Sequence, residues 1–136
     1  MDAKELRIEN LVNFEFHKDS GGTKAINVLA SDLIKILHFE KSKFYKPIPL
    51  TEEWLLRFKE VEKKVFDSEE TGYGVEYHIK INENLIMNIQ DDMSFCLESI
   101  SDDSKYVYLE NDFLDTVHFL QNIYNVLTKG KELTIK

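Results

Sequence analysis

The chain of 136 residues contains little cysteine, proline or glycine. Its one cysteine, Cys96, excludes an intramolecular disulfide and a zinc cluster built from cysteines. Its two prolines, Pro47 and Pro49, fix the backbone and predict an extended connector instead of a helix. Four of its five glycines stand in Gly21-Gly22 and Gly72-Tyr73-Gly74, which lack the lysine and following serine or threonine of a phosphate-binding loop. These glycines therefore predict turns.

Positive charge is also scarce, and so are long apolar runs. Lys and Arg total 17 against 25 Asp and Glu, and the resulting net charge of −8 repels phosphate backbones. We therefore expect no direct binding to nucleic acid. The apolar runs are far shorter than the roughly 20 residues that cross a bilayer, and the first residues carry no signal-peptide pattern. The expectation is a cytoplasmic protein that does not enter a membrane.

The chain does contain enough apolar material for a core, at 43% hydrophobic and 12% aromatic residues. Near the N-terminus, β-branched and aromatic residues over 6–16 and 25–29 flank the turn sequence 18–22. This pattern predicts a β-hairpin. Ser31 then offers an N-cap for a short helix over 32–37.

Residues 51–66 have the pattern of an amphipathic helix. Thr51 is a strong N-cap, and Leu50 can pack on Leu55 across it. Apolar residues recur at helical spacing on the expected core-facing stripe, which consists of Trp54, Leu55, Phe58, Val61 and Val65.

Alternating residues and polar turns then predict four strands in an antiparallel meander, over 75–81, 85–90, 95–100 and 105–110. Asn111 or Asp112 is expected to cap a second amphipathic helix, which Gly130 closes in a left-handed conformation. The apolar stripe of that helix consists of Phe113, Val117, Leu120, Tyr124 and Leu127. The tail over 132–135 is expected to add an edge strand.

The sequence thus predicts one α+β domain over residues 1–136. An N-terminal β-hairpin region, 1–46, joins a four-stranded antiparallel meander that is packed by two amphipathic helices. Whether the N-terminal region closes into a barrel stays open.

Three blocks of the sequence resemble a family of small uncharacterised bacterial and phage-encoded proteins. Residues 6–12 resemble LRIGNLV, with Glu9 in place of the glycine, and residues 47–58 resemble PIPLTEEWLLKFGF. Residues 117–133 resemble VHQLQNLYFALTGEEL, with Phe119 at the first glutamine. The resemblance implies an SH3-like β region before the central helix and an origin in bacterial chromosomes, prophages or mobile elements. It implies no activity and no catalytic residues.

Two segments carry candidate partner-binding residues. Phe44, Tyr45 and Ile48 place apolar groups beside lysines, and the alternative for this segment is a half-buried strand. His118 and Gln121 flank the apolar stripe of the second helix, where the alternative is a solvated or sheet-capping role. No assembled nucleophile appears beside them. We therefore expect a non-enzymatic binding or accessory protein, acting as a protein–protein interaction module.

Two other classes of function stay open. A small enzyme or ligand-binding protein would form its site in three dimensions, near His78, His118 and the acidic turns. An acidic decoy would occupy a basic nucleic-acid-binding site on another protein. The acidic pairs Glu69-Glu70, Asp91-Asp92 and Asp102-Asp103 lack the spacing of a calcium loop, and the histidines lack the spacing of metal ligands. We therefore expect no metal and no cofactor.

Overall fold

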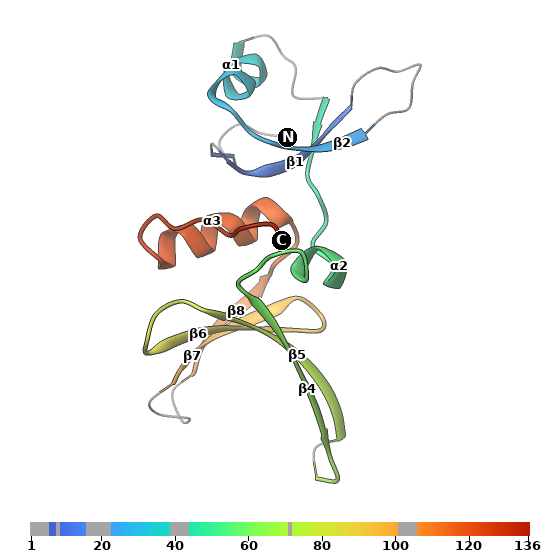
Figure 1. Ribbon diagram of the computed structural model, residues 1–136, viewed down its shortest axis with the longest axis vertical. Helices are drawn as coiled ribbons and strands as arrows, with labels where there is room; N and C mark the ends of the chain where they lie inside the picture. The colour runs from blue at the N-terminus through green and yellow to red at the C-terminus, as the bar shows by residue number, and fades with distance from the viewer. Residues whose placement is uncertain (1–5, 8, 16–22, 39–43, 71, 101–105) are drawn as a thin grey trace. The chain divides into compact units, whose positions relative to one another are not determined.

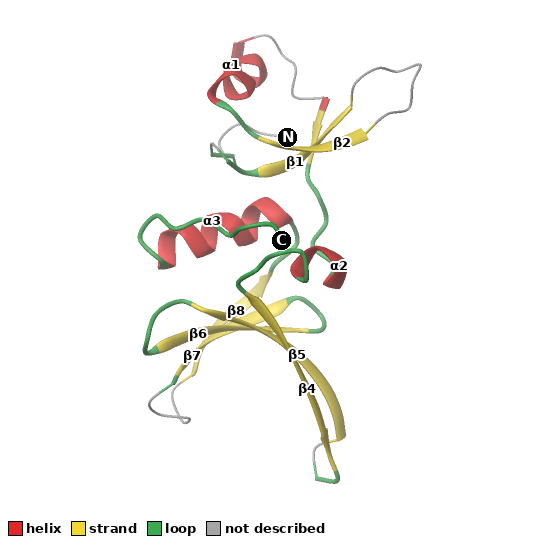
Figure 2. Ribbon diagram, viewed as in Figure 1, coloured by secondary structure: helices red, strands yellow, loops and turns green. Residues whose placement is uncertain are grey.

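The computed structural model describes residues 6–7, 9–15, 23–38, 44–70, 72–100 and 106–136. Its fold is of the α+β class, as predicted, with antiparallel sheets of three and five strands (Figure 1 and Figure 2). The chain divides into two compact units. The first comprises Met1–Pro49 with Thr116–Ile123, and the second comprises Leu50–Asp115 with Tyr124–Lys136. In the part of the chain that the structure describes, no helix has the length and hydrophobicity to cross a membrane.

The sheet of the first unit has the strand order β2-β1-β3. Its strands are β1 (Leu11–Glu15), β2 (Thr23–Asn27) and β3 (Tyr45–Lys46). β1 and β2 pair in antiparallel register, which confirms the predicted hairpin, while its turn at 18–22 lies outside the described residues. The pairings of the described residues leave β2 and β3 on opposite edges, so this sheet is open.

The helix α1 (Ala30–His38) follows β2. The prediction of Ser31 as N-cap is wrong, because Ser31 lies inside the helix. Leu29 is instead the residue before the helix, and its amide donates to Asp32 Oδ2 at 2.9 Å. This is the bond of a capping box in which the side chain of the third helical residue accepts from the N-cap amide. The core of the first unit is a buried cluster of Leu6, Val12, Val28, Ile36 and Tyr45.

A tight bend precedes β1 at Glu9, whose φ of 73° lies in the left-handed region. The bend allows the Glu9 amide to donate to Val28 O at 2.8 Å, and the Val28 amide to donate to Asn10 O at 2.7 Å. The backbone therefore adopts a conformation that suits glycine at a site where this chain carries a side chain.

Replacing Glu9 by glycine is expected to raise the free energy of unfolding by about 1 kcal/mol, because glycine adopts positive φ without the steric cost of a Cβ. The matched control is Glu9→Ala, which removes the same carboxylate and keeps the Cβ. Chemical denaturation of the wild type and both variants measures the difference. Equal stabilities of the glycine and alanine variants would argue against strain at this bend.

The second unit is built on a sheet whose five strands are neighbours in chain order. The strands are β4 (Val61–Ser68), β5 (Gly72–Lys80), β6 (Leu85–Gln90), β7 (Ser94–Ser99) and β8 (Tyr106–Phe113). The strands β5 to β8 form the predicted four-stranded meander, and β4 adds a fifth strand ahead of it. The core side of this sheet includes the fully buried residues Ile79, Met87 and Ile89.

The predicted helix over 51–66 is wrong beyond its first turn. Thr51 is the N-cap, as expected, and its side chain accepts a hydrogen bond from the Trp54 amide at 3.3 Å. However, α2 (Glu52–Leu55) is one turn long, and the chain then enters β4. The spacing of Val61 and Val65 explains the error, because residues four apart share a face in both a helix and a strand. Continuous pairing with β5 along the whole of β4 stabilises the strand.

The second long helix, α3 (Val117–Leu127), begins later than predicted. Asn111 and Asp112 lie in β8, so neither is the cap. The Thr116 hydroxyl instead accepts a hydrogen bond from the Phe119 amide at 3.3 Å. The predicted stripe is buried at Val117, Leu120 and Tyr124, whereas Phe113 is an exposed strand residue.

Gly130 has positive φ, as predicted, but the residue that closes α3 in the left-handed conformation is Lys129, one position earlier. Gly130 has a φ of 108°, and Lys129 before it has a φ of 56°. The Gly130 amide donates to Asn125 O at 2.8 Å, as in a Schellman motif. Farther on, the tail does not form the expected edge strand, since Ile135 makes only an isolated bridge with Phe58.

Candidate functional site

Tyr45 and Ile48, two of the expected partner-binding residues, are core residues. Their exposed fractions are 1% and 2%, and the half-buried Phe44 packs against the cluster that contains Tyr45. The Tyr45 hydroxyl donates to Asp32 Oδ1 at 2.9 Å. Burial, with the Asp32 carboxylate as a further cause, raises the pKa of Tyr45 to about 12. Tyr45 and Ile48 are thus inaccessible to a partner, and residues 39–43 of the same segment lie outside the described residues.

His118 and Gln121, the expected residues on α3, are also buried, with exposed fractions of 5% and 3%. Gln121 is placed by hydrogen bonds within the first unit. Its Oε1 accepts from the Leu11 amide at 2.8 Å, and its Nε2 donates to Glu9 O at 3.4 Å. The Arg7 guanidinium donates to Gln121 O at 2.9 Å. Gln121 therefore holds the bend at Glu9 and the start of β1, and its amide is not presented to a partner.

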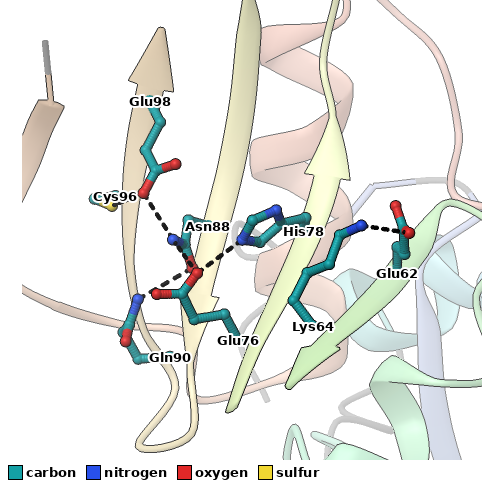
Figure 3. A network of polar contacts seen from close by, with 8 residues as sticks. All are labelled: Glu62, Lys64, Glu76, His78, Asn88, Gln90, Cys96 and Glu98. Atoms are coloured by element: carbon teal, nitrogen blue, oxygen red, sulfur yellow. Dashed lines mark hydrogen bonds and ion pairs between the residues drawn. The ribbon is translucent and has the colours of Figure 1, made fainter. Parts of the chain in front are cut away.

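His78 lies on a polar face of the second unit's sheet, which Figure 3 shows with its side chains. Cross-strand pairing places Glu62, His78, Asn88 and Cys96 in one row over four strands. A neighbouring row contains Lys64, Glu76 and Gln90. The hypothesis of a site shared by His78 and His118 gains no support here, because His118 belongs to the first unit and His78 to the second.

The centre of the polar face is Asn88, of which only 2% is exposed. Its Nδ2 donates to Glu76 Oε2 at 2.9 Å and to Glu98 Oε1 at 2.7 Å (Figure 3). Its Oδ1 accepts from Gln90 Nε2 at 3.0 Å, and His78 Nε2 lies 2.8 Å from Glu76 Oε2. A single amide thus joins two carboxylates that would otherwise repel each other. These groups are occupied with one another, which is the arrangement of a structural network.

Cys96, at the β7 end of the row, is not an activated nucleophile. Its exposed fraction is 4%, and its Sγ lies 4.0 Å from Glu98 Oε1. Burial first, and then the charges of Glu98 and Glu76, raise the pKa of Cys96 to about 11. A reactive cysteine has the opposite environment, with positive charge nearby and access to solvent.

Alkylation of Cys96 by iodoacetamide at pH 8 is expected to be at least about a hundredfold slower in the folded protein than in the unfolded chain, because a thiol with a raised pKa holds few thiolates. The rate should rise as the pH approaches 11, the pKa of the folded thiol, while the fold is retained. Mass spectrometry of timed samples, with a denatured sample as control, measures both rates. Folded and unfolded rates within about threefold of each other at pH 8 would contradict the assigned environment.

The described residues contain no group of three or more His, Cys, Asp or Glu side chains that could hold a metal ion. The acidic turns do not change this. Asp92 accepts hydrogen bonds from Ser94, which lower the pKa of that carboxyl, and Asp102-Asp103 lies outside the described residues. Glu69 and Glu70 form an exposed hairpin turn between β4 and β5.

The far end of the β4–β5 hairpin is the feature that the sequence did not predict. Of the residues of β5, only Glu76–Lys80 pair with β6. Beyond Glu76, β4 and β5 continue as a two-stranded hairpin, as Figure 1 shows. We call this end, residues 65–70 and 72–75, the arm. Its side chains include three exposed large apolar residues: Val65 at 55%, Phe66 at 44% and Tyr73 at 72%. Exposed apolar residues indicate a candidate interaction site where they share one face.

One face of the arm continues the core side of the sheet. Val65 pairs with Val75, and Asp67 pairs with Tyr73, so these four side chains share the face on which Tyr77 and Ile79 are buried nearer the core. We call Val65, Asp67, Tyr73 and Val75 the docking face. Phe66 pairs with Gly74 and belongs to the opposite face.

Comparison with known protein families, curated proteins and solved structures gave no match.

Proposed function

We propose that this protein is a non-enzymatic binding module that engages another protein through the docking face of the arm. The observation that carries the proposal is the exposure of Val65 and Tyr73 on a hairpin end that no third described strand covers. Nearer the core, Tyr77 and Ile79 on the same face of β5 are buried, whereas the arm places Val65 and Tyr73 in water. Covering them would remove apolar surface from water, which favours association.

The proposal keeps the class of function expected from the sequence and changes the contact surface. Tyr45, Ile48, His118 and Gln121 are buried, so the arm replaces them as the contact surface. The resemblance to bacterial and phage-encoded proteins supplies a context, in which the protein acts as an accessory factor in the cytoplasm. The arm needs no such context to bind, since its surface chemistry alone favours a partner.

Affinity capture from a host lysate with nuclease treatment tests the proposal through three baits. The wild type is compared with Val65→Ser combined with Tyr73→Ser, and with the control Val126→Ser, which changes a residue of α3 that is 75% exposed. One stoichiometric protein that the wild type and the control retain, and the arm variant loses, is the expected result. Equal retention by all three baits, or no retained protein, would overturn the proposal.

A small enzyme or ligand-binding protein is the second candidate, since the contact of His78 with Glu76 resembles a general base and its orienting carboxylate. The observation against it is that Glu76 also accepts from Asn88. The carboxylate that would orient His78 is therefore shared with the Asn88 network. An activity that Glu76→Gln abolished while the fold was retained would favour this candidate over the binding module.

A further inference from the structure

The arm itself carries net negative charge. Residues 65–75 include three carboxylates, Asp67, Glu69 and Glu70, and no Lys, Arg or His. Asp67, Glu69 and Glu70 are exposed, and none of them forms an ion pair with another residue that the structure describes. The nearest cations on β4 are already paired, Lys63 with Glu52 and Lys64 with Glu62.

These charges lie beside the apolar groups of the docking face. Asp67 is the direct cross-strand partner of Tyr73, and directly opposed residues have Cβ atoms about 5 Å apart. Glu69 and Glu70 follow at the turn, on the same end of the hairpin. A surface that covers Tyr73 therefore also covers or approaches Asp67, and it meets the two turn carboxylates at its rim.

Covering a carboxylate without pairing it costs free energy, because the charge loses its hydration. An uncharged or acidic partner would incur that cost at Asp67, and an acidic partner would also be repelled by Glu69 and Glu70. A partner with lysine or arginine side chains around an apolar centre avoids both costs, and its charge also speeds encounter. The chemistry of the arm thus selects among partners by the sign of their charge.

We infer that the occupant of the docking face is a basic protein segment whose apolar side chains pack on Val65 and Tyr73 while its cations meet Asp67, Glu69 and Glu70. This inference rests on the proposed function, since it assumes that the arm is the contact surface. It names a class of partner, an amphipathic cationic segment.

A fluorescein-labelled synthetic helix with one leucine face and one lysine face is the probe. Its binding to the full-length protein is measured by fluorescence anisotropy, beside two matched peptides in which glutamate replaces lysine or serine replaces leucine. The wild type is expected to bind the leucine–lysine peptide and neither of the others. Raising the salt should weaken binding, because exposed charges are screened over about 8 Å at physiological ionic strength.

Two charge variants then separate the arm from net charge. Glu69→Lys with Glu70→Lys is expected to weaken binding at least about tenfold, which corresponds to about 1.4 kcal/mol. Glu83→Lys with Asp115→Lys makes the same change in net charge at exposed residues outside the arm and should leave binding within about twofold. The neutral pair Glu69→Gln with Glu70→Gln, which keeps the side-chain shape, should fall between wild type and the reversed pair.

Equal weakening by the two charge-reversed variants, or no binding of the leucine–lysine peptide, would overturn the inference. These outcomes can be told apart from failure of the proposed function. Suppose that the variant with Val65→Ser and Tyr73→Ser loses a lysate partner, while the variant with Glu69→Lys and Glu70→Lys retains it. The arm would then remain the contact surface, and the inference that its partner is basic would be refuted.

Discussion

Phe58→Ala is expected to lower the free energy of unfolding by about 4 kcal/mol, since a buried phenylalanine loses both its transfer free energy and the packing of the cavity that remains. Phe58 has no exposed surface, and its backbone forms the bridge with Ile135 that holds the tail. Its neighbours Leu55 and Val61 are also buried. Urea denaturation followed by circular dichroism measures the loss.

Trp54→Ala is the matched control for Phe58→Ala. A helix over 51–66 would place both side chains on one core-facing stripe, and both substitutions would then be costly. In the structure Trp54 is half-buried, with the Arg57 guanidinium 4.3 Å from its ring centroid. We expect its loss to cost about 1 kcal/mol. Equal losses for the two variants would support the continuous helix and contradict β4.

Asn88→Asp is expected to lower the free energy of unfolding by about 3 kcal/mol or more. The substitution replaces an amide that donates to two carboxylates with a third carboxylate, which cannot donate to them. The substitution keeps the size and shape of the side chain, so no cavity contributes. Asn88 now donates to Glu76 and Glu98, and the aspartate would repel both. Denaturation at neutral pH measures the effect.

Asn84→Asp provides the control for this charge change, since Asn84 lies in an exposed turn. A cost within about 0.5 kcal/mol is expected there. The combination of Asn88→Asp with Glu98→Gln should recover part of the loss by removing one of the repelling charges. Strictly additive effects of the two substitutions would show that Asn88 and Glu98 are not coupled.

The sequence predicts best where one face of a strand is buried along its length. The inner half of β5 illustrates this over its own length, because Tyr77 and Ile79 are buried while Glu76, His78 and Lys80 alternate with them on the more exposed face. The cap at Thr51 was also predictable, because a cap depends on residues within one helical turn. Local chemistry of this kind can be derived from a single sequence.

The rest depended on contacts between residues far apart in the chain. The outer half of β4 is solvated on both faces, so it shows no alternation that distinguishes a strand from a helix. Gln121 meets the Leu11 amide across 110 positions, and no local pattern indicates that its amide is needed there. The arm is hidden from sequence reasoning for the same reason as β4, since the pattern predicts Val65 and Phe66 as the end of a helix.

The arm also has a consequence for local stability. From Val65↔Val75 to Ser68↔Gly72, the two strands are each other's only ladder partners among the described residues. Separating the two strands of the arm breaks few contacts, so we expect their amide protons to exchange with solvent through small local openings. The amide protons around Ile79, which lies between β4 and β6, require a much larger opening. A ligand on the docking face would slow exchange in the arm first, before any change in the midpoint of global unfolding.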